Sequence, residues 1–562
     1  MGSLMQIKTT LKEAVDQQRL YYPAKQDYLL LILILWLAAY LRFSGLNRPG
    51  FWLDELSYTL AAQKPILNQI INSTETLGDY LSVDPTLSAI PFSLFLKLGT
   101  SNFLARFPAA LFGVLGVALT YRLGRRLLGN TTGLLAAFLL ATSSFHILYS
   151  QEARSYTQFI FFSLASFFFF YRVIWQHSLT RWLFYGLSTW AAVSTNHLML
   201  FVIGVQGLFL LLISIQAVLS QTSKPAEIKQ QLKRWSYFLA ALLVVFLFRL
   251  PWLEDFTQRQ CAGCAIGRPS YPLDLAGSFL AAIGAFTAGS PGAISFSSIL
   301  ILFSLVLLLF YRPKPGGLLA CWLLLSIPVT ALGLWFISQF FHPRYTIWAL
   351  PAFFITLGFG LATLGSFIPR LVLAGQRAFI PNLPAKRSEI AILSLLLVPL
   401  LLINFGQIQQ HEIIKQSRPR GMLEDAARLI GANAAANDTI VAIGLPAKHL
   451  QFYLEPTRPD IHYLDDKIFI EQNAGLPPTL AGRWYVIHNS YAPPQIPQNW
   501  SGALHYHEFY DIVVVYQAKP CQMTDCILET KLLLSEISRA NPGSALEQVV
   551  NNIMAGLAQL NY

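Results

Sequence analysis

The sequence TTGLLAAFLLATSSFHILY (131–149) is followed by SQEARSY (150–156) and then by TQFIFFSLASFFFFYRVI (157–174). Each flanking run is almost free of charge. Each is also close to the ~20 residues that a helix needs to cross a bilayer. The pattern predicts two membrane-spanning helices joined by a short polar loop that lies at one membrane face.

The composition of the whole chain agrees with this interpretation. The 562 residues are 54% hydrophobic and only 12% charged, about half the charged share of a soluble domain. The mean hydropathy is +0.48. These values exclude a disordered chain, a collagen and a disulfide-dense mini-protein. They predict a polytopic α-helical membrane protein with a smaller soluble part.

Further apolar runs of spanning length bring the expected number of transmembrane helices to about eleven. The longest run, 182–219, fits two passes with a break at Asn196-His197. The run 86–98 is too short to cross and is expected to lie along the membrane surface. A Gly- and Ala-rich run at 272–289 is ambiguous. The remaining predicted spans are 27–43, 103–123, 235–253, 294–311, 318–338, 346–368 and 388–406.

The formal net charge of +11 comes from short Lys/Arg clusters between the apolar runs. This distribution argues against a nucleic-acid partner and is typical of cytoplasmic loops. If the N-terminus is cytoplasmic, all six clusters fall on one side. The polar segments 44–102, 150–156 and 339–345 then share the extracytoplasmic face. The pattern fits a bacterial inner membrane, although a eukaryotic internal membrane would give a similar one.

The composition changes after the last apolar run. We therefore expect residues 1–406 to form the membrane domain, with 44–102 as its first extracytoplasmic loop, and 407–562 to form an extracytoplasmic α/β domain. In the latter, the sequence predicts a helix at 420–432, helical segments after 525, and strands at 438–444, 483–488 and 511–517.

The cysteines form two close pairs and one single residue. Cys261 with Cys264, and Cys521 with Cys526, are expected to form two local disulfides in an oxidising compartment. Zinc binding or redox chemistry by the first pair is the alternative. Cys321 lies inside an apolar run, where we expect it to be packing.

Carboxylates and cations from three loops are predicted to meet on the extracytoplasmic face. Each group also has a purely structural interpretation. The adjacent acids of the first loop could form an ordinary surface turn, and the acid and arginine of the second could form an ion pair that anchors the helix ends. The arginine of the third loop could lie at the membrane interface, and His197 could be a hydrogen-bonded structural histidine. The candidate residues are Asp54 and Glu55 in FWLDE (51–55), Glu152, Arg154 and Tyr156 in SQEARSY, His342, Arg344 and Tyr345 in HPRY (342–345), and His197.

Together these residue types suit transfer of a group from a lipid-borne phosphate. A base must take a proton from an acceptor hydroxyl, which a carboxylate such as Asp54 can do. Cations must neutralise the departing phosphate, and the planar guanidinium groups of Arg154 and Arg344 suit that geometry.

The motifs resemble the GT-C membrane glycosyltransferases, in the branch of the protein O-mannosyltransferases and the lipid A aminoarabinose transferase. The matching stretches are FWLDE (51–55), RFP (106–108), GRRL (124–127), SQEARSY (150–156), Asn196-His197 and Arg344-Tyr345 with Pro351. The resemblance implies an inverting sugar transfer from a polyprenyl-phosphate donor on the outer face. It assigns Asp54 as the base or its neighbour, Glu152 to the same site, and Arg344 and Tyr345 to the donor phosphate.

One departure from the family pattern concerns the segment before the short surface helix. The family has His-Pro-Pro or Lys-Pro-Pro there, whereas this chain has Val83-Asp84-Pro85. Another cation, such as Lys64 or Lys97, could replace the missing one. Alternatively, a divalent metal (Mg or Mn) held by Asp54, Asp84 and Glu152 would supply the charge.

Two other functions compete with a monosaccharide transferase. A ligase or polymerase for a lipid-linked glycan would use similar outer-face chemistry. A transporter of lipid-linked glycans would show a repeat of helices and intramembrane charges, which the sequence does not favour. The expected partners are membrane lipids, the polyprenyl-phosphate donor and an acceptor that is a lipid, a protein or a glycan. The sequence does not identify the sugar.

Overall fold

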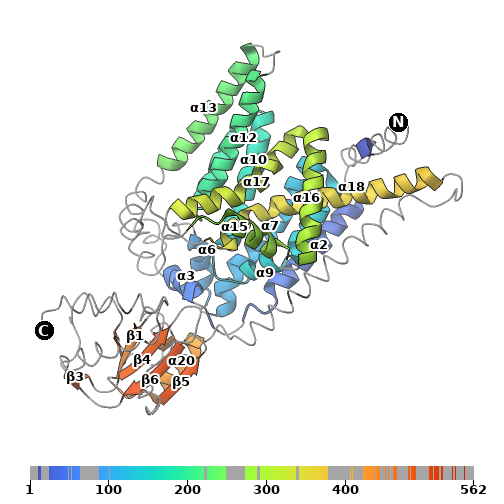
Figure 1. Ribbon diagram of the computed structural model, residues 1–562. Coiled ribbons are helices and arrows are strands. Elements are labelled where there is room, and N and C mark those ends of the chain that lie inside the picture. The colour runs from blue at the N-terminus through green and yellow to red at the C-terminus, as the bar shows by residue number, and fades with distance from the viewer. Residues whose placement is uncertain are drawn as a thin grey trace. The chain divides into compact units, whose positions relative to one another are not determined.

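A computed structural model gives the arrangement of the chain (Figure 1). It describes residues 11–13, 25–47, 50–51, 53–63, 88–99, 101–219, 225–247, 272–287, 291–336 and 341–376, and, toward the C-terminus, 406, 408, 422–436, 438–443, 450, 453–454, 460–464, 479–480, 483–488, 505–509, 512–517, 521–522, 535, 538–539 and 550. By contacts the chain divides into two compact units. The first is 1–46 with 61–411, and the second is 47–60 with 412–562.

Long apolar helices make up the first unit. They are α2 (Lys25–Phe43), α7 (Asn102–Leu128), α10 (Tyr156–Trp175), α12 (Met199–Leu219), α16 (Pro291–Tyr311), α17 (Pro313–Phe336) and α18 (Leu350–Gln376), which follows the 3₁₀ segment η3 (Pro343–Ala349). These seven are long and apolar enough to cross a membrane, and the bent pair α8 (Asn130–Thr142) and α9 (Ser144–Ser150) makes an eighth. The protein is therefore an integral, multi-pass membrane protein.

The predicted count of about eleven spans is not reached among the described residues. Helix α11 (Leu179–Val193) has 15 residues, and α15 (Leu275–Phe286), in the ambiguous run, has 12. Helix α13 (Pro225–Leu247) begins ten residues before the predicted run and carries Lys229, Lys233 and Arg234. The run 388–406 lies outside the described residues. Helix α6 (Ile90–Leu96) confirms that 86–98 holds only a short helix.

Small residues let the central helices approach closely. A Cβ atom on Gly124 of α7 would lie 3.2 Å from the Cα of Gly133 in α8, and one on Gly133 would lie 2.8 Å from the Arg125 nitrogen. Close approach through glycine is the usual basis of helix packing in a bilayer, where burial of apolar surface gives no advantage over lipid.

Aromatic rings and buried hydroxyls hold α10 against its neighbours. Phe167 stacks on Trp322 of α17 with ring centroids 3.6 Å apart. The Trp322 indole donates to the Trp348 carbonyl oxygen at 3.1 Å. Ser166 also shares a hydrogen bond with Thr189 of α11 at 2.9 Å. Cys321 is buried in α17, as expected for packing.

The second unit contains a mixed five-stranded sheet in the order β2-β1-β4-β6-β5 (Figure 1). Strands β1 (Thr439–Ile443) and β2 (His462–Leu464) are parallel, as are β1 and β4 (Arg483–His488). Strand β6 (Ile512–Gln517) is antiparallel to both β4 and β5 (His505–Phe509). A second, two-stranded sheet pairs β3 (Thr479–Leu480) with β7 (Cys521–Gln522).

The predicted strands at 438–444, 483–488 and 511–517 correspond to β1, β4 and β6, and the predicted helix to α20 (Met422–Asn433). Strands β2, β3, β5 and β7 are short or polar and were not predicted. The helical segments expected after 525 fall largely outside the described residues. The cysteine side chains of both expected disulfides do so entirely.

Candidate active site

The loop 151–155 joins α9 to α10 and holds two of the candidate residues, and a third, Tyr156, begins α10. Glu152, Arg154 and Tyr156 are all buried, at 3%, 8% and 3% exposure. The Arg154 amide donates to the Glu152 carbonyl oxygen at 2.7 Å, so the loop turns tightly. The Arg154 guanidinium donates to the Tyr156 hydroxyl at 3.4 Å and lies over its ring, 5.3 Å from the centroid.

Buried hydrogen bonds of Arg42 and Gln151 connect this loop and the preceding helices to α2. The Arg42 guanidinium, at the end of α2, donates to the carbonyl oxygens of Leu140 and Ala141 at 3.0 and 2.9 Å and lies 2.8 Å from His146 Nδ1. It therefore adds hydrogen bonds to carbonyl groups in the last turn of α8, where the chain bends by 62° into α9. The Gln151 side chain also donates to the Ser44 carbonyl oxygen at 2.9 Å.

The third predicted loop is held by its own short-range contacts. The Arg344 amide donates to His342 Nδ1 at 3.1 Å, and the Arg344 guanidinium donates to the Tyr345 hydroxyl at 3.3 Å. That guanidinium lies 5.2 Å from the centroid of the Tyr345 ring. Residues 343–345 belong to η3, which contacts α10, α15 and α17.

The two loops converge. The Arg344 guanidinium interacts electrostatically with both Tyr156 and Arg154. Two arginines from loops about 190 residues apart in the sequence are therefore brought within range of each other's charge, each held by a tyrosine. Arginines placed this way repel each other, and an anion between them would remove that repulsion.

His342 is kept neutral. Desolvation of its ring, followed by the charge of Arg344, lowers the pKa of His342 to about 4, although part of the side chain is exposed. Its Nδ1 is already an acceptor for the Arg344 amide, which agrees with a neutral ring. His342 therefore supports the loop as a neutral acceptor at pH 7.

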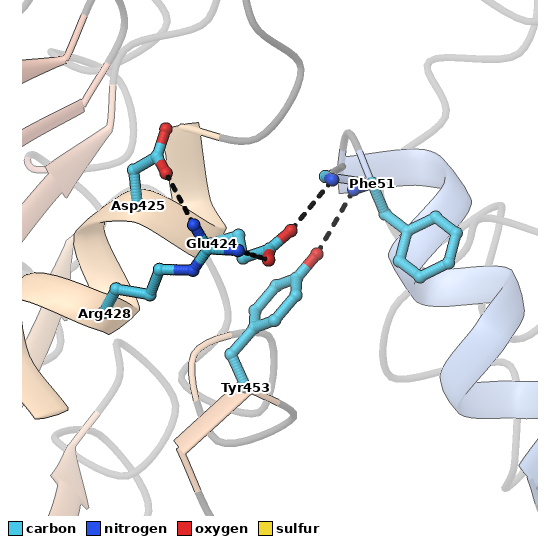
Figure 2. A network of polar contacts seen from close by, with 6 residues as sticks. Phe51, Glu424, Asp425, Arg428 and Tyr453 are labelled. Carbon is cyan, nitrogen blue, oxygen red and sulfur yellow. Dashed lines mark hydrogen bonds and ion pairs between the residues drawn. The ribbon is translucent and has the colours of Figure 1, made fainter. Parts of the chain in front are cut away.

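The FWLDE motif lies in the second unit, where it begins helix α3 (Leu53–Gln63). Figure 2 shows how the start of this helix is held by α20 and Tyr453. Glu424 Oε2 accepts from the Gly50 amide at 2.9 Å, and the Tyr453 hydroxyl accepts from the Phe51 amide at 3.2 Å. Glu424 Oε1 pairs with Arg428. Gly50 adopts a φ of 76°, a conformation that favours glycine.

Of the two acids in this motif, the structure describes the side chain of Glu55 but only the backbone of Asp54. Glu55 is fully buried in α3. The Asp54 backbone is helical, and its side chain lies outside the described residues. The contacts of Figure 2 define what we call the α3 clamp: Glu424 and Tyr453 holding the amides of Gly50 and Phe51.

The remaining predicted residues lie on other elements or outside the described residues. His197 is half-buried in the turn between α11 and α12, and Lys97 is exposed at the end of α6. Asp84 and Lys64 lie outside the described residues. Among the described residues, no group of three His, Cys, Asp or Glu side chains could hold a metal. The proposed metal-binding trio of Asp54, Asp84 and Glu152 stays a prediction, because Asp84 and the Asp54 side chain lie outside the described residues.

Sequence reasoning missed Arg42, His146 and Tyr149. A signal was available, since an arginine and a histidine inside apolar runs are costly unless something uses them. Tyr149 packs edge-on against Tyr156, with ring centroids 5.1 Å apart, and extends the aromatic wall of the loop.

Comparison with known proteins gives one family model and a shared fold. Residues 84–252 match the family model described as dolichyl-phosphate-mannose-protein mannosyltransferase, which spans Glu152, Arg154, Tyr156 and His197. ArnT from Cupriavidus metallidurans in the apo state is 14% identical, with a TM-score of 0.56 over 86% of this chain and 97% of that chain. The chain shares the fold of ArnT over most of its length. The resemblance seen in the motifs is therefore confirmed at the level of fold and family model.

A second structure of the same ArnT, bound to undecaprenyl phosphate, is also 14% identical. It gives a TM-score of 0.56 over 88% of this chain and 98% of that chain. No curated protein sequence matches significantly. The GT-C likeness therefore rests on one family model and on shared architecture rather than on a near relative.

Proposed function

We propose that this protein is a glycosyltransferase that moves a sugar from a polyprenyl-phosphate donor to an acceptor hydroxyl on the extracytoplasmic face. The observation that carries the proposal is the pair of Arg154 and Arg344, held on Tyr156 and Tyr345 where two loops converge. Guanidinium groups are the preferred partners of phosphate oxygens. The undecaprenyl phosphate bound to ArnT, which shares this fold, supports the same ligand class here.

In the proposed reaction, the bond between the sugar C1 and the phosphate oxygen breaks, and a bond from C1 to the acceptor oxygen forms. The polyprenyl phosphate leaves with an additional negative charge, which Arg154 and Arg344 stabilise. Asp54 takes the proton of the acceptor hydroxyl, and attack from the side opposite the phosphate inverts the configuration at C1. Glu55 and Glu152 are proposed to support this chemistry.

The α3 clamp gives the C-terminal domain a part in this proposal. Asp54 is the second residue of α3, and the clamp holds Gly50 and Phe51, which lie three and two positions before the first residue of that helix. We therefore propose that Glu424 and Tyr453 are positioning residues for Asp54.

The test uses the full-length protein in detergent with a panel of radiolabelled polyprenyl-phosphate sugars and a membrane extract as acceptor. The label released from lipid is measured for the parent, Asp54→Asn and Arg344→Ala, with and without EDTA. We expect release that both substitutions abolish. Loss of release in EDTA, restored by Mg²⁺ or Mn²⁺, would add the metal alternative. An active parent that tolerates Asp54→Asn would remove Asp54 as the base.

Folded parent protein that releases nothing from any donor would overturn the monosaccharide transferase. The ligase or polymerase would then be tested with a lipid-linked oligosaccharide, and the transporter with lipid flipping in proteoliposomes. Nothing in the described contacts favours either over the transferase.

A further inference from the structure

A second group of cations lies at the other end of α10. Trp175 is the last residue of this helix and Tyr156 the first. At 1.5 Å per residue, the two are separated by roughly 28 Å along the axis. Arg234 of α13 lies 5.5 Å from the centroid of the Trp175 ring, and Lys314 of α17 places its Nζ 4.3 Å from it. We call Arg172, Trp175, Arg234 and Lys314 the Trp175 cluster.

Positive charge is concentrated further around Arg172, one turn before Trp175. Its guanidinium lies 5.4 Å from the Phe168 ring centroid and is repelled by Arg122 and Arg126 of α7 and by Arg181 of α11. Five helices thus direct cations to one end of the membrane unit. Bringing such charges together is unfavourable unless a counter-charge is present.

The chain supplies very little negative charge to these helices. Between residues 85 and 226 the sequence contains a single acid, Glu152, which belongs to the opposite end of α10. Between 275 and 388 it contains none. Helices α7, α10, α11 and α17 therefore offer no carboxylate here. The single acid of α13 is Glu227, whose side chain lies outside the described residues.

Two buried donors in the cluster also lack acceptors. Neither Arg172 Nε nor Trp175 Nε1 has a hydrogen-bond partner among the described residues. A buried donor left without an acceptor costs about 1–3 kcal/mol. The cluster is therefore deficient in acceptor atoms as well as in negative charge.

We propose that the Trp175 cluster binds a phosphate group, supplied by the headgroup of an anionic phospholipid. A phosphate carries both the missing charge and several acceptor oxygens, and basic pockets between membrane helices are typical headgroup sites. The adjacent surface is apolar, with Leu179 and Leu183 of α11 and Leu232 of α13 exposed at 72%, 59% and 66%. Acyl chains would cover these side chains, whereas free phosphate would not. The inference does not rest on the proposed transferase activity.

The test measures lipid binding to delipidated full-length protein in detergent. Phosphatidylglycerol, phosphatidylcholine and inorganic phosphate are titrated separately, and bound lipid is counted by native mass spectrometry. We expect phosphatidylglycerol to bind tightest. The double variant Arg234→Gln/Lys314→Gln should weaken it about 25-fold, because each cation is worth about fivefold. The matched control Lys229→Gln/Lys233→Gln removes the same charge from exposed positions of α13 and should weaken it less than about threefold.

Trp175→Phe distinguishes a specific phosphate site from non-specific attraction of an anionic lipid to a basic surface. The substitution keeps an aromatic ring and removes the indole N–H donor. We expect it to weaken phosphatidylglycerol binding about fivefold with no change in net charge. Equal losses in the two double variants, together with an unaffected Trp175→Phe, would overturn the proposal. Competition by inorganic phosphate at the lipid's own concentration would contradict the lipid source and assign the site to free phosphate.

Discussion

At both ends of helix α10, cationic side chains lie over aromatic rings, but the surroundings of the two ends differ. At the Tyr156 end, Arg154 and Arg344 each lie over a tyrosine ring, and Glu152 is two residues from Arg154. At the Trp175 end, Arg234 and Lys314 share one indole ring, and helices α7, α10, α11 and α17 contain no acid. Arg154 is 8% exposed, whereas Lys314 is exposed. A buried arginine in a loop that also carries a glutamate suits chemistry, whereas an exposed lysine such as Lys314, on a helix without acids, suits attachment to a charged surface.

A histidine accompanies the cations at each end, and in both cases it is kept neutral. Desolvation followed by Arg344 lowers the pKa of His342 to about 4. Desolvation followed by Lys233 lowers the pKa of His177. The Nδ1 of each ring accepts a hydrogen bond, from the Arg344 amide at 3.1 Å and from the Trp182 indole at 3.0 Å. In neither place does a histidine add charge at neutral pH.

The largest expected effect is a loss of activity from a substitution at the Tyr156 end of α10 that has no counterpart at the Trp175 end. Arg344→Ala should lower kcat/KM about 10²–10³-fold, because a charge that stabilises the leaving phosphate is lost. Arg344→Lys should recover only part of it, since an ammonium group lacks the planar fork. The control is Arg234→Ala, at the Trp175 end, which should leave sugar release within twofold of the parent. Equal losses from the two alanine variants would break the comparison.

Backbone packing at the Tyr156 end gives the second prediction. A Cβ atom on Gly113 of α7 would clash with the Ser150 side chain and come within 3.0 Å of Arg42 Cδ. Gly113→Ala should therefore destabilise the protein by about 1–3 kcal/mol, measured by thermal unfolding in detergent. The matched control is Gly204→Ala in α12, where a Cβ atom meets nothing within 4 Å and should be tolerated. An unchanged midpoint for Gly113→Ala would contradict the close approach.

The α3 clamp provides a third point of comparison with the two ends of α10. Its residues accept hydrogen bonds from backbone amides, whereas the arginines at the Tyr156 end are proposed to face a phosphate. Glu424→Ala and Tyr453→Phe should each lower kcat about fivefold, the value of about 1 kcal/mol for one hydrogen bond, with little change in KM for the donor. Glu424→Gln keeps an acceptor oxygen and should restore most of the activity.

Arg428→Ala is the control for the clamp, since it removes the partner of Glu424 Oε1 and leaves Oε2 with the Gly50 amide. It should be near neutral. An Arg428→Ala loss as large as that of Glu424→Ala would show that α20 itself, rather than the contact with Gly50, is what matters.

The smallest effect concerns pH. Because the pKa of His342 lies near 4 in the folded protein, its titration should leave no inflection in activity between pH 5.5 and 8. The ratio of His342→Gln to parent activity should stay flat over that range. In the unfolded chain the ring takes up a proton near pH 6.5, so this group lowers stability as pH falls from 6.5 toward 4. A step near pH 6.5 that His342→Gln removes would contradict the neutral assignment.

Much of the fold was predictable because long apolar runs permit few structures in a bilayer. The spans at 103–123 and 157–174, and the break at Asn196-His197, correspond to α7, α10 and the turn between α11 and α12. The run 131–149 was predicted as one span, and in the structure it bends by 62° between α8 and α9. Arg42 of α2 donates to carbonyl oxygens next to this bend, and no local pattern could reveal that contact.

The sequence by itself determined that this is a membrane protein with acids and arginines in three polar segments, in motifs that resemble those of the GT-C glycosyltransferases, because residue types and their spacing carry that information. Tertiary structure decided which of these residues meet. It brought Arg344 to Arg154 and put the start of α3 in the same compact unit as α20. It also gathered cations from five helices around Arg172 and Trp175. Such contacts join residues tens to hundreds of positions apart, and only the packing of the helices specifies them.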